Sequence, residues 1–284
     1  MNDFVAFALS RGVLINPAKL YASEKIKRCP TEAHPKSTNG AYFFDGYRGW
    51  VYSWDGDNQV HWSNSERKPW TEAEKQAWKQ KRQDARRAEQ IKHAQAAHTA
   101  QQMLRDATLE RHDYLHRKGF RDMDGHVMNG ELLIPMRDLA SNALRGVQRI
   151  WWDGEERKFQ KKMLHGMSAK LAVLRLGPQK PQETIFVEGY ATGLSVALAA
   201  HQMGLRASVL VCFSDRNLVA VASHVSGRKY CYADHDKSGA GERAAIDAGL
   251  PYCMSDTLGN DANDDHVRHG LMAVRIKLME ARMK

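Results

Sequence analysis

The chain has 284 residues, of which 43% are hydrophobic and 26% are charged, and its formal net charge is +9. This length and composition allow two domains with ordinary hydrophobic cores. Because no apolar run approaches the ~20 residues of a membrane span, and no basic stretch precedes an apolar one at the start, we expect a cytoplasmic protein without a membrane partner.

The first 70 residues predict a short helix and a small β-rich region. Residues 3–15 have an amphipathic pattern that breaks near Gly12. Alternation over residues 41–54, together with Asp-Gly turn pairs, predicts an antiparallel sheet. Its aromatic side chains form either a small core, which we favour, or a surface that stacks the bases of a single strand. They are Tyr42, Phe44, Tyr47, Trp50, Tyr52 and Trp54, and the second interpretation adds Lys27, Arg28 and Arg48 as phosphate contacts.

The four cysteines do not indicate a disulfide framework, because they show no CxxC spacing and three of them lie in apolar runs. Cys29 and His34 could supply half of a zinc site. The remaining ligands of a four-ligand set are missing nearby, so we expect no zinc site.

Residues 71–107 predict a long helix, because they contain no Pro or Gly and are rich in Ala, Gln, Lys, Arg and Glu. Its length would be about 50 Å at ~1.5 Å per residue. The apolar stripe is thin, which favours a solvated connector. Residues 66–105 hold 10 basic and 5 acidic side chains, so contact with nucleic acid stays open as an alternative.

The segment 108–178 reads as strands separated by turns, namely ELLIPMRD, ALRGVQRIWWD and LAVLRLG. Residues 143–178 contain 8 basic and 3 acidic side chains. Positive charge is in excess over the whole of residues 1–178, with 30 basic and 21 acidic side chains, whereas residues 179–284 hold 12 of each. We therefore expect a polyanion to meet the first part of the chain and to be processed by the second.

Residues 179–284 predict successive βα units of a parallel sheet. Three apolar runs, TIFV, VLVCF and KYCYA, end in polar or acidic residues, and the first and third continue through small residues into a helical pattern. The ends of parallel strands lie together at one edge of a sheet, so we expect the acidic residues there to converge on one crevice. These residues are Glu188, Asp234, Asp236, Asp261 and Asp264.

Asp234 and Asp236 are two residues apart, so on a strand both carboxylates would point to the same side. Like charges at short range raise each other's pKa unless a cation lies between them, and Mg²⁺ is the usual cation. Such a site suits an in-line attack on phosphate. The alternative is that both aspartates serve only the turn at Asp236-Lys237-Ser238-Gly239, with Ser238 as the N-cap of a helix.

The order VEGYATGLSV, ADHDKSG and GNDANDD resembles the TOPRIM domain, which bacterial-type DNA primases share with type IA and type II topoisomerases and some nucleases. It is most similar to the TOPRIM domain of primases carried by plasmids and phages. The resemblance implies acid/base and metal-binding roles for Glu188 and Mg²⁺ binding by Asp234 and Asp236. We expect Asp261 or Asp264 to complete the metal site. The late segment K-G-x-D-x-N-D is matched at four positions, whereas Leu258 replaces its lysine; the matching residues are Gly259, Asp261, Asn263 and Asp264.

The preceding segment is similar to the part of these primases that forms the other wall of the active-site cleft. It shares a YL-x-x-KG turn, a strand that ends in P-M, a Q-x-I strand and a D-G…K-F hairpin. The resemblance implies that Asn263 and a set of cations contact template or nucleoside triphosphate. The cations are Arg149, Lys158, Lys161, Lys162 and Lys170.

The implied fold is α/β: a TOPRIM parallel sheet flanked by helices, after a mixed α+β primase subdomain and a small β-rich N-terminal region. The expected regions are 1–70, 71–107, 108–178 and 179–284.

The implied function is that of a DNA primase, a nucleotidyltransferase that makes short RNA primers on single-stranded DNA with Mg²⁺ or Mn²⁺ and nucleoside triphosphates. Its origin would be a plasmid, a phage or another mobile element. Because the chain has no GxxxxGK[ST] helicase loop, we expect a separate replicative helicase as a partner. Two alternatives stay open: a TOPRIM nuclease, and a non-catalytic DNA-binding replication or anti-defence factor.

Overall fold

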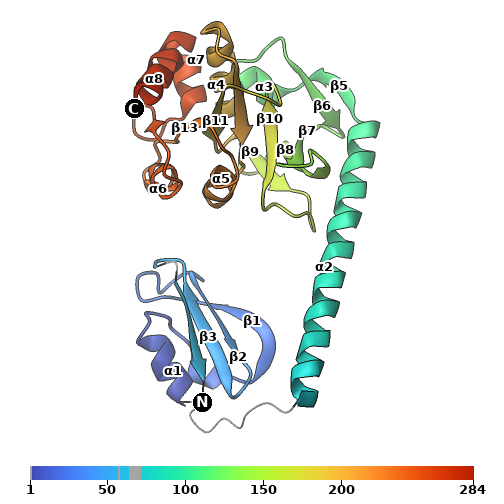
Figure 1. Ribbon diagram of the computed structural model, residues 1–284, viewed down its shortest axis with the longest axis vertical. Helices are drawn as coiled ribbons and strands as arrows, with labels where there is room; N and C mark the ends of the chain where they lie inside the picture. Colours follow the sequence, from blue (N-terminus) through green and yellow to red (C-terminus); the bar gives the residue numbers. More distant parts are fainter. Residues whose placement is uncertain (1, 57, 64–71) are drawn as a thin grey trace. The chain divides into compact units, whose positions relative to one another are not determined.

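A computed structural model of the protein describes residues 2–56, 58–63 and 72–284. The chain forms two compact units, Met1–Arg82 and Gln83–Lys284. The boundary between them falls inside helix α2, Glu72–Asp106 (Figure 1). This helix confirms the prediction for residues 71–107 over the described range.

The described residues of the first unit form a four-stranded antiparallel sheet and include helix α1 and the first part of α2, which confirms the predicted small sheet. Its elements are α1 (Asn2–Leu9), a 3₁₀ turn (Pro17–Lys19), β1 (Ser23–Cys29), β2 (Gly40–Phe44), β3 (Arg48–Ser53) and β4 (Asn58–Ser63). Helix α1 is shorter than predicted, because the chain turns after Leu9 and reaches a left-handed conformation at Gly12, with φ of 70°.

The two faces of this first sheet divide the aromatic residues. Tyr42 and Phe44 are buried against Phe4 of α1, with ring centroids 6.3 and 4.8 Å apart, so these two belong to a core as predicted. Phe43 and Trp50 lie on the opposite face, because neighbouring residues of a strand alternate, and their centroids are 6.5 Å apart. Base stacking on that face stays a prediction.

Cys29 and His34 have separate surroundings in the structure. Cys29 is buried in the core of the first unit, and burial raises the pKa of its thiol to about 11. His34 Nδ1 lies 2.8 Å from Asp55 Oδ1.

The second unit contains a ten-stranded sheet within the described residues, in the order β14-β13-β11-β12-β10-β7-β6-β5, with β8 and β9 added at β7. The strands are β5 (Thr108–Arg111), β6 (Asp124–Met128), β7 (Glu131–Asp138), β8 (Leu144–Asp153), β9 (Lys158–Met163), β10 (Ala172–Leu176), β11 (Glu183–Val187), β12 (Ala207–Val211), β13 (Arg228–Tyr232) and β14 (Tyr252–Cys253). The helices after α2 are α3 (Asp113–Arg117), α4 (Tyr190–Gln202), α5 (Asp215–Ala222), α6 (Ala240–Asp247), α7 (Ala262–His269) and α8 (Leu271–Met283).

Strands β14, β13, β11 and β12 are parallel and are linked by helices, which confirms the predicted βα units. Strand β10 pairs antiparallel with both β12 and β7. The predicted strands of segment 108–178 therefore continue the same hydrogen-bonded sheet. The expected boundary near residue 178 would separate β10 from β12, which are paired. The sheet as a whole is mixed.

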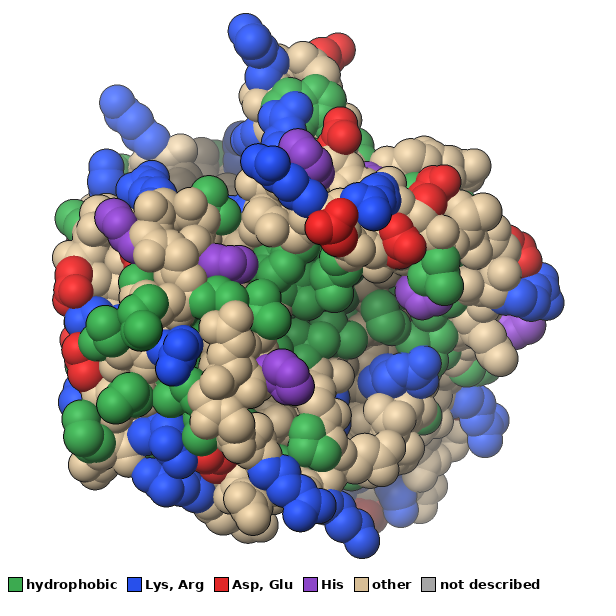
Figure 2. All heavy atoms as spheres, turned by 90° about the horizontal axis from the view of Figure 1, so that it is seen from above, with side chains coloured by type: hydrophobic (Ala, Val, Ile, Leu, Met, Phe, Trp, Pro, Cys, Tyr) green, Lys and Arg blue, Asp and Glu red, His purple; other side chains and the backbone are tan. Residues whose placement is uncertain are grey.

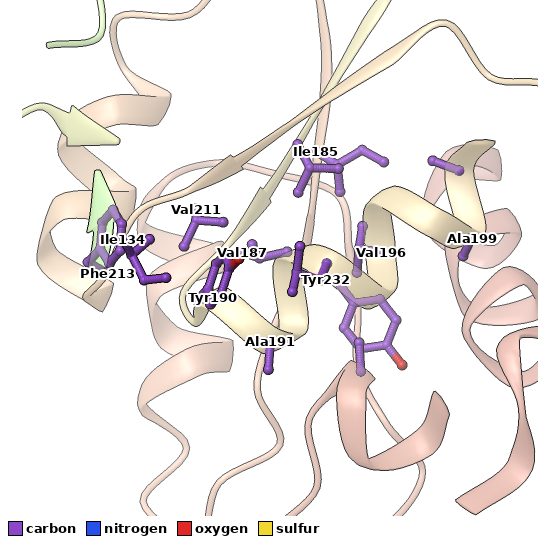
Figure 3. Close-up of a cluster of buried hydrophobic side chains, with 14 of the residues drawn as sticks. Ile134, Ile185, Val187, Tyr190, Ala191, Val196, Ala199, Val211, Phe213 and Tyr232 are labelled. Carbon is purple, nitrogen blue, oxygen red and sulfur yellow. The ribbon is translucent and has the colours of Figure 1, made fainter. Parts of the chain in front are cut away.

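Alternating side chains of the parallel strands enter two cores. Ile185 and Val187 pack with residues of α4 and α8, as Figure 3 shows for α4. Phe186 packs on the other face with Leu218 of α5 and Ala245 of α6. The parallel strands are thus covered by helices on both faces, as continuous apolar runs such as TIFV predict.

The order of the strands reverses at β11. From β11 the chain passes through α4 to β12, the neighbouring strand on one side of β11. Strand β13 is the neighbour on the other side of β11, and the helix after it, α6, covers the sheet face opposite to that of α4. In open α/β sheets, ligands bind outside the carboxyl ends of the strands at such a reversal. Glu188 follows β11 and Asp234 follows β13, so both lie at this point.

Among the described residues, we find no helix that combines the length and the apolar character needed to cross a bilayer.

Candidate functional site

Glu188 is held where β11 turns into α4. Its backbone carbonyl accepts a hydrogen bond of 2.9 Å from the N–H of Phe213, which follows β12. Phe213 has a φ of 65°, a left-handed conformation that is uncommon for a bulky residue. Backbone strain of this kind concentrates at functional sites. The two strand ends are therefore tied together beside the Glu188 carboxyl group.

Asp215 is an acidic neighbour that the sequence analysis did not include. Burial, the nearby charge of Asp215 and a hydrogen bond between the two side chains together raise the pKa of Glu188 to about 8, with burial the largest cause. Asp215 begins α5, directly after its N-cap Ser214. The signal was present in the sequence, because VLVCFSD is an apolar run that ends in an acid like the other two.

Asp234 is the most enclosed of the predicted metal ligands. Burial raises its pKa to about 7, with further contributions from the charges of Asp261 and Asp215, while Lys161 acts in the opposite direction. Its Oδ1 atom is buried without a hydrogen-bond partner among the described residues. An unpaired buried carboxylate oxygen is costly, so a cation or a proton is needed there.

Because β13 ends at Tyr232, both aspartates lie in the loop that follows the strand, and not on the strand as predicted. Asp236 differs from Asp234 in its environment. Its carboxylate accepts hydrogen bonds from the backbone N–H groups of Ser238, Ala240 and Gly241 and from the Ser238 hydroxyl. Burial acts to raise its pKa, but these hydrogen bonds outweigh it and hold the pKa at about 2. Asp236 is therefore ionised at neutral pH.

The start of α6 differs from the prediction. Gly239 is its N-cap, in the left-handed region with a φ of 68°, rather than Ser238. The reason is that Asp236 already supplies the oxygen acceptors for the first turn, so no side chain is needed at the cap position. Asp236 thus serves the turn, and metal binding by its carboxylate stays a prediction.

Asp261 and Asp264 form the capping box of α7. Asp261 Oδ1 accepts from the N–H groups of Asn263 and Asp264 at 2.7 and 2.9 Å, and Asp264 Oδ2 accepts from the Asp261 N–H at 3.2 Å. Asp261 Oδ2 also accepts from the Thr192 hydroxyl at 3.0 Å. Asp261 still contributes charge to Asp234. Both residues are within the acidic region, but their oxygens already serve the helix.

Asn263, expected to contact a nucleotide, is fully buried. Its amide donates to the Lys118 carbonyl oxygen at 2.8 Å and to the Ser195 hydroxyl at 3.0 Å. These bonds join α7 to α3 and α4, and they leave the amide inaccessible to a nucleotide in this structure. The structure therefore gives Asn263 a packing role in place of the expected contact.

The expected cations do not share one surface. In the β8–β9 pair, Lys161 is opposite Ile150 and Lys162 is opposite Arg149, so the two lysines point to opposite faces. Lys161 is the one whose charge acts on Asp234. Arg149 forms a bidentate ion pair with Glu131 at 2.5 and 2.6 Å on the other face.

The remaining expected cations are at the surface. Lys158 pairs with Glu156, and its strand partner Asp153 places it on the face of Arg149 and Lys162. Lys170 is exposed in the loop before β10. Lys161 therefore has the strongest support among the five expected cations, through its charge on Asp234.

Lys118 and Tyr114 complete the site and were not among the predicted site residues. Lys118 Nζ lies 3.7 Å from Asp264 Oδ1. Tyr114 is 1% exposed, and its hydroxyl has no hydrogen-bond partner among the described residues. Burial raises the pKa of Tyr114 to about 12, with Lys118, Asp261 and Asp264 acting on it. The YL-x-x-KG turn that contains both residues was the available signal.

No three His, Cys, Asp or Glu side chains of the described residues form a ready-made metal cluster. Mg²⁺ does not require one, because it is usually bound by one or two carboxylates together with waters and substrate phosphates. The unpaired Asp234 oxygen and the ionised Asp236 are hard oxygen donors of this kind. The residues present therefore fit a hard divalent cation.

Positive charge is distributed over the visible face of the molecule in Figure 2 rather than gathered in one patch.

Comparison with models of protein families finds no match, and comparison with curated proteins finds none either. Among solved structures, a structure of the DnaG catalytic core is similar to 53% of this chain, with 15% sequence identity and a TM-score of 0.36. The match spans about half of that structure, 52% of its length. A likeness of this size does not establish a shared fold.

Proposed function

We propose that the protein is a TOPRIM-type primase that joins nucleotides on single-stranded DNA. The observation that carries this proposal is the electrostatic coupling of Glu188, Asp215 and Asp234, together with the charge of Lys161 on Asp234, at the reversal point of the sheet. Strongly shifted carboxyl groups at such a point favour a catalytic site over a structural one. The opposing acids and lysine suit the transfer of a phosphoryl group.

Glu188, Asp234 and Asp236 are the residues that would hold Mg²⁺ or Mn²⁺. When bound, the cation supplies positive charge that neutralises the transferred phosphate. Asp236 is fixed in advance by its hydrogen bonds and is ionised at neutral pH, so it needs no reorganisation. Asp234 presents the buried oxygen that lacks a partner.

Two side chains of the protein would act on the reacting groups directly. Lys161 provides positive charge for the phosphates of an incoming nucleoside triphosphate. Glu188 has a pKa of about 8 and therefore exchanges its proton near neutral pH, as a general base requires. We assign to its carboxylate the removal of the proton from the attacking 3′-hydroxyl.

Primer synthesis tests the proposal. The full chain is incubated with single-stranded DNA, labelled ribonucleoside triphosphates and Mg²⁺, and the products are separated by length. We expect labelled oligonucleotides from the wild type, and a loss of at least about 100-fold in Asp234→Asn and Asp236→Asn. Asp247→Asn, an exposed carboxylate at the end of α6, is the matched control and keeps full activity.

Two other outcomes would contradict the primase assignment. Shortened DNA, dependent on Asp234 and Mg²⁺, identifies a nuclease that uses water in place of the primer hydroxyl. Intact DNA without labelled product identifies a binding protein.

A further inference from the structure

The β8–β9 hairpin carries an exposed aromatic group beside the acidic residues. Trp152 is 41% exposed, and its ring packs edge to face with that of Phe159 across the hairpin, with centroids 5.1 Å apart. The guanidinium of Arg117, from α3, lies 4.3 Å from the centre of the Trp152 ring and 5.5 Å from that of Phe159. Arg117 forms no ion pair with a carboxylate of the described residues.

Ring and cation contacts link this group to Lys161, whose charge acts on Asp234. Phe159 and Lys161 are two residues apart on β9, so they lie on the same face as Trp152. The Tyr114 ring is 5.2 Å from Phe159, and Lys161 Nζ is 5.4 Å from Tyr114. Lys161 in turn acts on Asp234. We name this group the hairpin platform; it consists of Arg117, Trp152, Phe159 and Lys161. Its inner residue, Lys161, is electrostatically linked to Asp234.

The opposite face of the same hairpin provides a comparison. Trp151 lies there between Arg149 and Lys162, each 5.7 Å from its ring centre. Arg149 is neutralised by its bidentate pair with Glu131. Only the platform face combines an exposed ring, cations without described ion-pair partners, and a path to the acidic residues.

We propose that the hairpin platform binds single-stranded DNA, with an unpaired base stacked on Trp152 and the adjacent phosphate on Arg117, while Lys161 stays available to the incoming nucleotide. This inference rests on the proposed function and deepens it by locating the strand. Aromatic rings stack unpaired bases independently of sequence, and Arg and Lys contact the backbone phosphates.

Binding is measured by the fluorescence anisotropy of a labelled oligothymidine, with the full chain and without divalent cations. We expect Trp152→Ala and Arg117→Ala each to weaken binding about tenfold, because base stacking and phosphate contacts are lost. Trp151→Ala, the neighbouring ring on the opposite face, is the matched control and binds as the wild type does. Trp152→Phe keeps a stacking ring and restores most of the affinity. Circular dichroism of each variant verifies the fold.

Three results would overturn the inference: equal binding by Trp152→Ala and the wild type, a loss in Trp151→Ala of the same size, or displacement of the oligonucleotide by an equal concentration of free nucleoside triphosphate. The last would mean that Trp152 holds a free nucleotide. The assay contains no metal and no synthesis, so it is independent of catalysis. Variants that lose DNA binding in a protein that makes no primers would support the platform while the primase assignment fails.

Discussion

Lys161 and Lys162 are adjacent on β9 and point to opposite faces of the sheet, and the charge of Lys161 acts on Asp234. A count of basic residues cannot separate them, whereas the two-residue repeat of a strand can, once the register with β8 is known. Arg149 shows a second limit of prediction from sequence, because its ion-pair partner Glu131 lies on a different strand, 18 residues away in the sequence. Sequence therefore predicted a basic segment correctly but not which of its cations serve the site.

We predict that Lys161→Ala lowers the rate of primer synthesis by about 100-fold, because a positive charge near the transferred phosphate is lost. Lys162→Ala is the matched control on the opposite face, and we expect it to stay within about twofold of the wild type. Initial rates at saturating nucleotide provide the comparison. Equal losses in both variants would indicate a general role in DNA attraction rather than a role at the site.

The raised pKa values of Glu188 and Asp234, about 8 and about 7, predict how stability depends on pH. The folded state keeps protons that the unfolded state releases above pH ~4, so the free energy of unfolding falls as the pH rises from ~4 to ~8 in the absence of metal. Asp236 does not contribute in this window, because its pKa is about 2.

Asp234→Asn removes one of these carboxyl groups and tests this dependence. We expect the variant to exceed the wild type in stability by at least about 1 kcal/mol at pH 8, since one pKa unit corresponds to ~1.4 kcal/mol, and to match it near pH 4. Urea unfolding at both pH values without divalent cations measures the difference. Equal stabilities at pH 8 would mean that Asp234 is not strained by burial and like charge.

The loop between β13 and α6 depends on the absence of a side chain at Gly241. A Cβ atom there would overlap the carbonyl oxygen of Asp234 and would lie 3.0 Å from its nitrogen. We predict that Gly241→Ala lowers the free energy of unfolding by about 1–3 kcal/mol, as overpacking does, and reduces primer synthesis by displacing Asp234.

Gly154→Ala is the control for this substitution, because no atom lies within 4 Å of its added Cβ, and we expect a change within about 0.5 kcal/mol. Unfolding curves of both variants are compared with that of the wild type. A Gly241→Ala protein with wild-type stability and activity would show that the loop adapts freely and does not hold Asp234 in place.

The elements with strong periodicity were predicted well from sequence. Helix α2 and strands β7, β8, β11 and β13 have local signals that tertiary packing does not override. The caps were harder to predict, because Asp236 uses hydrogen bonds from three backbone N–H groups and shifts the start of α6 to Gly239. Whether the first N–H groups of a helix bond to the N-cap side chain or to an earlier loop residue depends on the conformation of the folded loop.

Assembly of the whole sheet could not be predicted from sequence. The placement of β10 between β7 and β12 joins the middle segment to the parallel strands, and antiparallel pairing of this kind has no local signal. It aligns α3 and β9 with the carboxyl ends of β11 and β13, which is how Lys118 and Lys161 reach the acidic residues. The burial of Asn263 likewise follows from packing among three helices.

Direct binding of Mn²⁺ tests most closely whether the acidic residues of the second unit hold a divalent cation. Electron paramagnetic resonance of free Mn²⁺ gives the bound fraction during titration of the full chain at pH 8, where Glu188 and Asp234 are at least half ionised. We predict saturable binding that Mg²⁺ displaces, that weakens at least about tenfold in Glu188→Gln and Asp234→Asn, and that Asp247→Asn preserves. Equal Mn²⁺ binding by all four proteins, or none by the wild type, would contradict the proposed site.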